Sequence, residues 1–286
     1  MDDRQFHQLL KESAEKLNKA GIDAGVAEVE IILEKLLDIE RIDVHLHGAR
    51  LLTDSLLDKF HKIIKKRRTR YPLQYILGEA YFYGRRFLVN PAVMVPTPET
   101  ELLCELAVNY VKNENFETVE ILDIGTGSGV ICVTVACELE NSWLTAIDKT
   151  QSAIGMARKN AALYGVGSKI NFIKSDLFSA LDPENKYDLI LSNPPYISEG
   201  EYKRLPPEVL ADPKISLVSG VEGLDIIKEL INKAPNYLKD NGRLMFEIGY
   251  NQGERIKELT RNNEHYRSFT IFKDLNNIDR VVILSL

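Results

Sequence analysis

Three glycines follow the first apolar segment in the second part of the chain. Gly125, Gly127 and Gly129 come directly after residues 119–124 and before an apolar stretch with helical spacing. Glycine adopts backbone angles that other residues avoid, and it lets a ligand approach the backbone closely. Dinucleotide-binding proteins place glycines with the related spacing G-x-G-x-x-G at a strand-to-helix turn. We therefore predict that the cofactor-binding residues include Gly125, Thr126, Gly127, Ser128 and Gly129.

Two acidic residues extend this prediction to an adenosine cofactor. Asp148 ends the next apolar segment, about 20 residues after the last glycine, where a carboxylate accepts hydrogen bonds from both ribose hydroxyls. Asp176 follows the third segment and is placed to accept from an adenine amino group, with Leu177 against the ring. An acidic pocket without a phosphate-binding group suits a sulfonium nucleoside better than a dinucleotide. The alternative is a glycine turn with acids that only cap helices.

A pair of prolines follows the fourth apolar segment, in the order Asn193-Pro194-Pro195-Tyr196. Two prolines fix the backbone and remove two N–H donors, so the carbonyl groups there turn toward a ligand. The Asn193 side-chain oxygen and the Pro194 carbonyl can accept the two hydrogens of a planar NH₂ group, and Tyr196 can supply an aromatic face. We predict that these four residues form the catalytic site and that Asn193 also contacts the cofactor. The alternative is an ordinary Pro-Pro loop.

The elements that position these residues alternate between strand and helix. Such alternation predicts an α/β fold with a mostly parallel, doubly wound sheet that binds ligands at its carboxyl edge. The expected strands are 119–124, 144–147, 170–173, 189–191, 244–248, 269–272 and 281–284. Helices are expected from 129, over 153–163, over 224–238 and after 253.

The first part of the chain has a different pattern. Apolar residues recur at helical spacing from Gln5 to Arg70, which predicts a small helical bundle. Residues 79–95 alternate as strands do around a turn, which predicts a β-hairpin. We expect three parts: a helical substrate-recognition domain over 1–78, a hairpin linker over 79–95, and a catalytic domain over 96–286.

Composition excludes several classes of protein. The 286 residues carry a net charge of −6, and the acidic excess falls in the second part of the chain, which is unlike a DNA-binding domain. Three cysteines without C-x-x-C spacing indicate neither a disulfide framework nor a zinc site, and no metal is predicted. There is no apolar run of membrane-spanning length, and the polar start lacks a signal pattern, so we expect a cytoplasmic protein. We also expect a monomer.

One basic cluster is an exception to the acidic balance. No acidic residue occurs between Asp58 and Glu79, and the segment carries Lys62, Lys65, Lys66, Arg67, Arg68 and Arg70. A charge run of this kind is usually the solvated end of a helix. Contact with RNA or with an acidic partner is the alternative.

The glycine turn and the Asn193 motif together resemble the class I S-adenosylmethionine-dependent methyltransferases that modify planar amino groups. Those groups are adenine or cytosine amines, or a glutamine amide. Further motifs are similar to the HemK/PrmC family: 72–78, 82–84, 87–89, 95–101, 247–249 and 252–253. The chain departs from that family at Thr97, where arginine is common, and at Leu177, where some members have an aromatic residue.

The resemblance implies a substrate and a reaction. Members of the family methylate the glutamine of the Gly-Gly-Gln motif in peptide chain release factors, with S-adenosyl-L-methionine as donor and S-adenosyl-L-homocysteine as product. It implies that release factors are the protein partners and that neither DNA nor a membrane is bound. The alternatives are a ribosomal-protein glutamine methyltransferase, a nucleic-acid adenine amino methyltransferase, which would need to extrude its base, and a cofactor-binding scaffold without activity.

Overall fold

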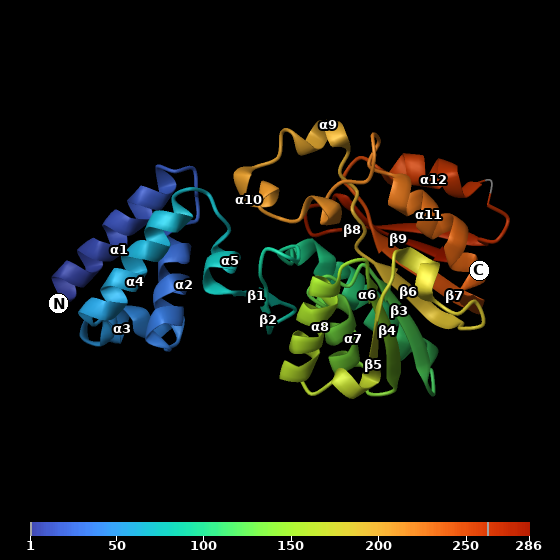
Figure 1. Cartoon of the computed structure of the whole chain (residues 1–286), viewed down its shortest axis with the longest axis horizontal. Helices are drawn as coiled ribbons and strands as arrows, with labels where there is room; N and C mark the ends of the chain where they lie inside the picture. The colour runs from blue at the N-terminus through green and yellow to red at the C-terminus, as the bar shows by residue number, and fades with distance from the viewer. Residues whose placement is uncertain (1, 262) are drawn as a thin grey trace. The chain divides into compact units, whose positions relative to one another are not determined.

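The computed structural model describes residues 2–261 and 263–286, which form two compact units (Figure 1). The helical unit contains the residues up to Gly78 together with Pro206–Ala211. The second unit contains Glu79–Leu205 and Asp212–Leu286, and we call it the catalytic unit because the residues predicted to be catalytic lie in it. The polypeptide therefore passes from one unit to the other three times, after Gly78, Leu205 and Ala211.

Amphipathic helices build the helical unit. Its elements are α1 (Asp3–Asn18), α2 (Gly25–Leu37), α3 (Arg41–Leu51), α4 (Asp54–Arg67), α5 (Leu73–Leu77) and, from the later segment, α10 (Pro207–Leu210). Asp2 and Gln5 form a capping box at the start of α1, and the Thr53 hydroxyl caps α4. Phe6, Leu17 and Phe60 are almost wholly buried in the core between the helices. The helical bundle expected from the apolar spacing is present.

The basic cluster at the end of α4 is partly neutralised inside this unit. Arg67 is buried, and its guanidinium donates to Glu28 at 2.7 and 3.0 Å and to Glu208 at 3.0 Å. Arg70 donates to the same Glu208 carboxylate at 2.9 and 3.0 Å. The description of this cluster as a solvated helix end is therefore wrong for Arg67, because carboxylates of α2 and α10 both hold it.

A seven-stranded sheet with the order β5-β4-β3-β6-β7-β9-β8 forms the centre of the catalytic unit. The strands are β3 (Val119–Ile124), β4 (Ser142–Asp148), β5 (Ile170–Lys174), β6 (Tyr187–Ser192), β7 (Leu238–Glu247), β8 (Ser268–Lys273) and β9 (Asp279–Ser285). Strands β3 to β7 run parallel to one another, and β9 runs antiparallel to both β7 and β8. The α/β fold class predicted from the alternation is confirmed.

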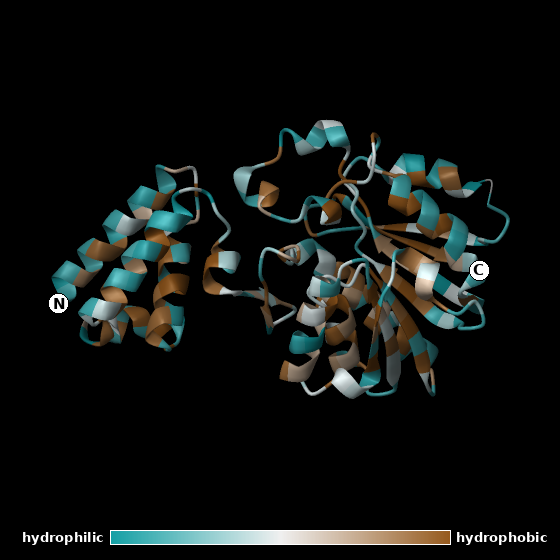
Figure 2. Cartoon of the chain, viewed as in Figure 1, coloured by the Kyte–Doolittle hydropathy of each residue, from teal (hydrophilic) through white to brown (hydrophobic). Residues whose placement is uncertain are grey.

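Helices cover both faces of this sheet. One apolar core includes residues of α6 (Glu101–Glu114), α7 (Val130–Glu138) and α8 (Gln151–Leu163), and the other includes residues of α11 (Asp225–Lys233) and α12 (Gly253–Arg261). Figure 2 shows the apolar colour concentrated on the strands between these helices. All six residues of β6 are buried, as expected for a central parallel strand. The short helix α9 (Glu199–Tyr202) follows β6.

Two boundaries differ by more than two residues from the expected ones. The helix expected over 224–238 ends at Lys233 and is followed by a 3₁₀ turn at Ala234–Asn236, where Pro235 interrupts the helical hydrogen bonds. The strand expected at 244 begins at Leu238, because its first residues pair with the start of β6.

The expected linker belongs to the catalytic unit. Strands β1 (Glu79–Phe82) and β2 (Arg85–Leu88) form an antiparallel hairpin, and Tyr83 and Gly84 at its turn both have positive φ. Phe82 and Phe87 are buried in the core that includes α6 and α7. The hairpin is therefore shorter than residues 79–95, and its aromatic side chains are part of the packing of the catalytic unit.

Candidate active site

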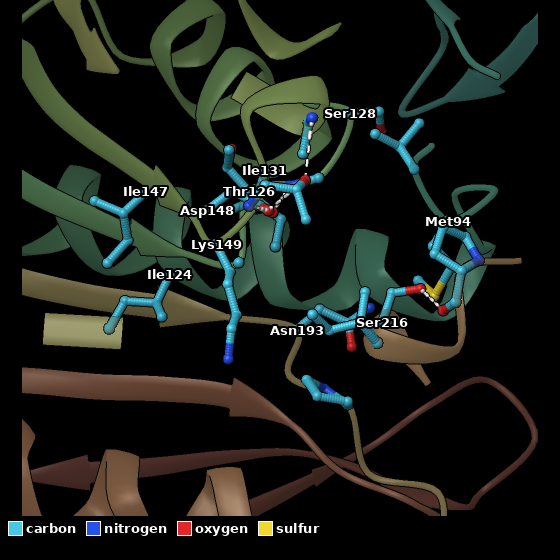
Figure 3. A pocket seen from close by; sticks show the side chains of 18 of the residues that line it. Met94, Ile124, Thr126, Ser128, Ile131, Ile147, Asp148, Lys149, Asn193 and Ser216 are labelled. Atoms are coloured by element: carbon cyan, nitrogen blue, oxygen red, sulfur yellow. Dashed lines mark hydrogen bonds between the residues drawn. The ribbon is translucent and has the colours of Figure 1, made fainter. Parts of the chain in front are cut away.

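A cavity of about 330 Å³ opens at the carboxyl ends of β3, β4 and β6. The strand order reverses between β3 and β6, and such a switch point is where doubly wound sheets bind ligands. Of the predicted site residues, nine line the cavity: Gly125, Thr126, Gly127, Ser128, Asp148, Asp176, Leu177, Asn193 and Pro195. Figure 3 shows the side chains of Thr126, Asp148 and Asn193 around it. Gly129, Pro194 and Tyr196 are not among its lining residues.

The three glycines of the turn have different roles. All have positive φ, between +56° and +84°. A Cβ at Gly129 would lie 3.0 Å from Ala157, so this glycine allows α7 to pack closely on α8. A Cβ at Gly125 would meet nothing within 4 Å, and one at Gly127 would meet only the Gly125 carbonyl, at 3.9 Å. The first two glycines therefore leave space at the cavity wall, and the third serves helix packing.

Asp123 supports the turn from below. Its buried carboxylate accepts from the Thr126 hydroxyl at 2.6 Å and from the Cys132 N–H at 3.2 Å. Burial raises the pKa of Asp123 to about 6, although these hydrogen bonds oppose that shift. Its second oxygen, Oδ1, has no hydrogen-bond partner among the described residues.

Asp148 is fixed by its own surroundings. Its Oδ1 accepts from the N–H and the hydroxyl of Thr150, at 2.8 and 3.0 Å, and its Oδ2 accepts from the Gly127 N–H at 3.1 Å. These bonds orient the carboxylate beside the glycine turn. A carboxylate has about four acceptor positions, so further hydrogen bonds can still form.

Asp176 lies in a more exposed part of the cavity wall. Its carboxylate is 2.7 Å from the Lys149 ammonium, and both side chains are more than half exposed. Leu177 has a φ of +49°, and its carbonyl accepts from the Ser175 hydroxyl at 2.5 Å. Asp176 thus already has a charged partner, which the sequence analysis did not foresee.

The Asn193 side chain is held by residues from other elements. Its Nδ2 donates to the Thr100 hydroxyl at 2.9 Å, and that hydroxyl donates to Glu247 Oε2 at 2.6 Å. Glu247 lies next to Asn193 because Ser192 of β6 pairs with Phe246 of β7. Among the described residues, no hydrogen bond to Asn193 Oδ1 is formed, so this oxygen is available to a ligand in the cavity.

Tyr196 is tied to the same carboxylate. Its hydroxyl donates to Glu247 Oε1 at 3.1 Å, and Gln252 donates to its backbone carbonyl at 2.9 Å. Glu247 is fully buried, and burial raises its pKa to about 7 while the Thr100 and Tyr196 hydrogen bonds oppose the shift. The Tyr196 ring therefore has a structural attachment in addition to the aromatic face predicted for it.

Sequence reasoning assigned no role to Thr100, Glu247 and Gln252. All three lie within motifs noted for their family resemblance, at 95–101, 247–249 and 252–253. Their contacts join residues 51 to 147 positions apart. The motifs could have marked these three residues as functional. Their contacts could not be predicted, because they depend on the neighbouring positions of β6 and β7 in the sheet.

The arrangement can place two ligands next to each other. The open glycines and the fixed Asp148 carboxylate suit a nucleoside with free ribose hydroxyls, and the Asn193 oxygen suits a donor such as an amide NH₂. The described residues contain no group of three His, Cys, Asp or Glu placed to hold a metal ion. No helix in the described part of the chain is long and apolar enough to cross a membrane.

Two family descriptions match the chain. Residues 8–78 match the PrmC N-terminal domain, and residues 100–220 match the methyltransferase small domain. Among solved structures, the catalytic domain of hMettl16 in complex with the MAT2A 3′UTR hairpin 6 is similar, with a TM-score of 0.56 and 17% identity over 82% of each chain. This likeness concerns the fold alone.

Curated relatives match nearly the whole chain. A release factor glutamine methyltransferase of Fusobacterium nucleatum subsp. nucleatum is 39% identical over 277 residues, which are 96% of this chain and 77% of that protein. A release factor glutamine methyltransferase of Bacillus cereus is 33% identical over 285 residues, 99% of each. These matches confirm the family inferred from the motifs: the chain belongs to the release factor glutamine methyltransferases, within the class I methyltransferases.

Proposed function

We propose that the chain transfers a methyl group from S-adenosyl-L-methionine to the side-chain amide nitrogen of the glutamine in the Gly-Gly-Gln motif of release factors. The observation that carries this proposal is the side chain of Asn193. Its nitrogen is anchored by Thr100, and its oxygen is available beside the glycine turn. S-adenosyl-L-homocysteine is the second product. The protein acts as a monomer in the cytoplasm, where translation ends.

The residues around the glycine turn hold the methyl donor. Asp148 would accept from the ribose hydroxyls, and the space beside Gly125 and Gly127 would admit the ligand close to the backbone. Asp176 and Leu177 line the same cavity and would contact the adenine. When bound, S-adenosylmethionine supplies the methyl group at an electrophilic carbon. The backbone of Thr126 and Ser128 completes the turn, and Gly129 keeps α7 in place.

Asn193 and the Pro194 carbonyl orient the acceptor amide. An amide nitrogen is a weak nucleophile because its lone pair is delocalised into the carbonyl. Two acceptors that hold both N–H groups direct this nitrogen at the methyl carbon and stabilise the positive charge that develops on it as the N–CH₃ bond forms and the S–CH₃ bond breaks. The methylated nitrogen then releases one proton to solvent. Alignment of this kind contributes up to about 7–11 kcal/mol in favourable intramolecular reactions. Pro195 and Tyr196 fix the loop that carries both acceptors.

The helical unit recognises the protein substrate. Ile42 and Leu46 of α3 are 71% and 65% exposed, and Val26 of α2 is also exposed. Ile42 and Leu46 are four residues apart and therefore lie on one face of the helix. Exposed apolar residues gathered in this way are typical of protein-binding surfaces. Lys62, Lys65 and Arg68 of the basic cluster are exposed and offer a contact for acidic groups.

Locating the transferred label tests the substrate. The enzyme is incubated with S-adenosylmethionine labelled on its methyl group and with a release factor, ribosomal proteins or DNA. We expect label on the release factor and none when its Gly-Gly-Gln glutamine is changed to alanine. Label on a ribosomal-protein glutamine, or on adenine in DNA, would replace the proposal by one of the two alternative substrates.

Surface variants test the role of the helical unit. The double variant Ile42→Ser/Leu46→Ser is expected to raise KM for the release factor by about tenfold without changing cofactor affinity, since about 1.4 kcal/mol corresponds to tenfold. The matched control is Leu275→Ser, an exposed apolar residue between β8 and β9. Equal KM values for the double variant and the wild type would show that this face of α3 does not bind the substrate.

A further inference from the structure

The orientation of the Asn193 amide needs a cause. A side-chain amide can present its oxygen or its NH₂ group in nearly the same space, and only the oxygen can accept from a substrate N–H. An inverted Asn193 would place NH₂ against NH₂. The partner on the opposite side of Asn193 therefore decides whether the site can bind the substrate amide.

Thr100 fixes the orientation of the Asn193 amide only because its hydroxyl donates to Glu247. A threonine hydroxyl can either donate or accept, so alone it would accept either end of the asparagine. Its single proton is committed to Glu247 at 2.6 Å, and an ionised carboxylate only accepts. The Thr100 oxygen is then left as an acceptor, and it selects the Asn193 NH₂ group at 2.9 Å.

We propose that Glu247 is a positioning residue, which acts through the Thr100 hydroxyl to keep the Asn193 oxygen directed at the substrate amide. This inference rests on the proposed function for the nature of the bound group. Glu247 also accepts from Tyr196, three residues after Asn193, so one buried carboxylate holds both ends of the acceptor motif. Gln252 supports the same loop through the Tyr196 carbonyl.

The surroundings of Glu247 make its charge sensitive to pH. Burial raises its pKa, Glu99 raises it further, and Arg280 of β9 lowers it. Arg280 is itself paired with Asp274 at 3.1 Å. Burial holds the pKa of the Cys104 thiol on α6 and the Tyr196 phenol above their usual values, so both stay neutral. Protonated Glu247 can donate to Thr100, whose own proton is then free to meet the Asn193 oxygen.

Substitutions at Thr100 test the relay directly. Thr100→Val keeps the shape of the side chain but removes the hydroxyl, and we expect kcat to fall 10- to 100-fold with cofactor affinity within threefold, since small misplacements have costs of this size. Thr100→Ser restores the hydroxyl and is expected to recover most of that loss. The matched control is Thr134→Val, because the buried Thr134 hydroxyl of α7 has no partner among the described residues.

A measurement without substrate separates this inference from the proposed function. The Asn193 side-chain NH₂ is followed by ¹⁵N NMR and assigned by its absence in Asn193→Asp. We expect its hydrogens to exchange with solvent at least tenfold faster in Thr100→Val than in the wild type or Thr100→Ser. If the wild type fails to methylate release factor, the proposed function falls while this measurement still decides the inference.

The pH profile tests the part played by Glu247. In the wild type, kcat is expected to fall as pH decreases through about 7, and in Glu247→Gln that inflection should be absent because glutamine does not titrate. Unchanged exchange and unchanged kcat in Thr100→Val would overturn the inference. A wild-type inflection that persists in Glu247→Gln would equally overturn the role of its carboxylate.

Discussion

The two ends of the cavity use carboxylates in opposite surroundings. At the cofactor end, Asp176 is more than half exposed and is paired with Lys149. At the acceptor end, Glu247 is fully buried and accepts from two hydroxyls. Water screens the first pair, so its loss changes little, whereas the position of a single proton matters at the second. We therefore expect the loss of Asp176 to change nucleoside binding little and the loss of Glu247 to disturb the amide site.

The largest effect should follow from the loss of Asn193. We expect Asn193→Ala to lower the single-turnover rate of methyl transfer by about 10²- to 10³-fold, by analogy with the removal of one oxyanion-hole donor. Cofactor affinity, measured by calorimetry, should stay nearly unchanged. A rate within tenfold of the wild type would remove Asn193 from the proposed mechanism and with it the contrast between the two ends.

Asn193→Asp sharpens the same comparison. Above pH 7 the Thr100 proton cannot serve both Glu247 and a new carboxylate, so this variant should also lose about 10²-fold in rate, as expected for a misplaced acceptor. Below pH 7 protonated Glu247 can donate to Thr100, which can then donate to the aspartate. The rate of Asn193→Asp should therefore rise as pH falls, opposite to the wild type. A parallel fall in both enzymes would contradict the relay.

The ionised form of Glu247, which the proposed mechanism needs for activity, should lower the stability of the folded protein. Its pKa is raised from 4.5 to about 7 in the folded state, so the ionised form opposes folding by roughly 3 kcal/mol. This cost is full above pH 7 and disappears as pH falls toward 4.5. We expect the free energy of unfolding of Glu247→Gln, relative to the wild type, to decrease by most of that amount between pH 8 and pH 5 in denaturant titrations.

An exposed carboxylate provides the control for that experiment. Hydrogen bonds from Arg255 and Lys228 lower the pKa of Glu222, so its ionised form favours folding and Glu222→Gln should show a small trend of the opposite sign. The same trend in both variants would mean that the effect does not come from burial of Glu247.

Asp148→Ala should have an intermediate effect at the cofactor end. Loss of a charged acceptor costs roughly 1.5–3 kcal/mol, so affinity for S-adenosylmethionine should fall about 10- to 150-fold. Thr150→Val leaves the carboxylate in place and removes one of its partners, and a smaller loss is expected. Calorimetry that finds unchanged affinity for Asp148→Ala would exclude its role at the ribose.

The smallest effect is expected for Asp176→Ala. To contact adenine, the Asp176 carboxylate must give up its contacts with Lys149 and water, so the net gain in binding is small. Exposed ion pairs contribute only about 0–1 kcal/mol. We expect cofactor affinity to fall less than about fivefold, with a similarly small change for Lys149→Ala. A loss at Asp176 as large as that at Asp148 would remove the distinction between the exposed Asp176 and the Asp148 carboxylate that hydrogen bonds hold in place.

Local patterns explain what could be predicted from the sequence. The glycine turn, Asp148 and Asn193 each follow directly on an apolar strand, and parallel strands bring their carboxyl ends to one edge. These local patterns were sufficient to predict the sheet and to predict that these residues lie around one cavity. The hairpin at 79–88 could also be predicted, because the spacing of apolar residues changes there from helical to alternating. The burial of its aromatic side chains could not be predicted.

Long-range contacts explain what could not be predicted. The position of Thr100 between Asn193 and Glu247 depends on the register of β6 and β7 and on the segment before α6. The burial of Arg67 depends on Glu208, which lies in a different region of the sequence. In both cases a charged or polar residue looked ordinary in its local sequence, and its partner was fixed only by the tertiary fold.

The composition of the helical unit has a consequence for synthesis on the ribosome. Glu208 is made about 130 residues after the last residue of the N-terminal bundle, which at roughly 5–20 residues per second is a delay of several seconds or more. During that time Arg67 has Glu28 but lacks its second carboxylate. The helical unit is therefore completed late, because α10 is translated after most of the catalytic unit. The final packing of α4 must wait until then.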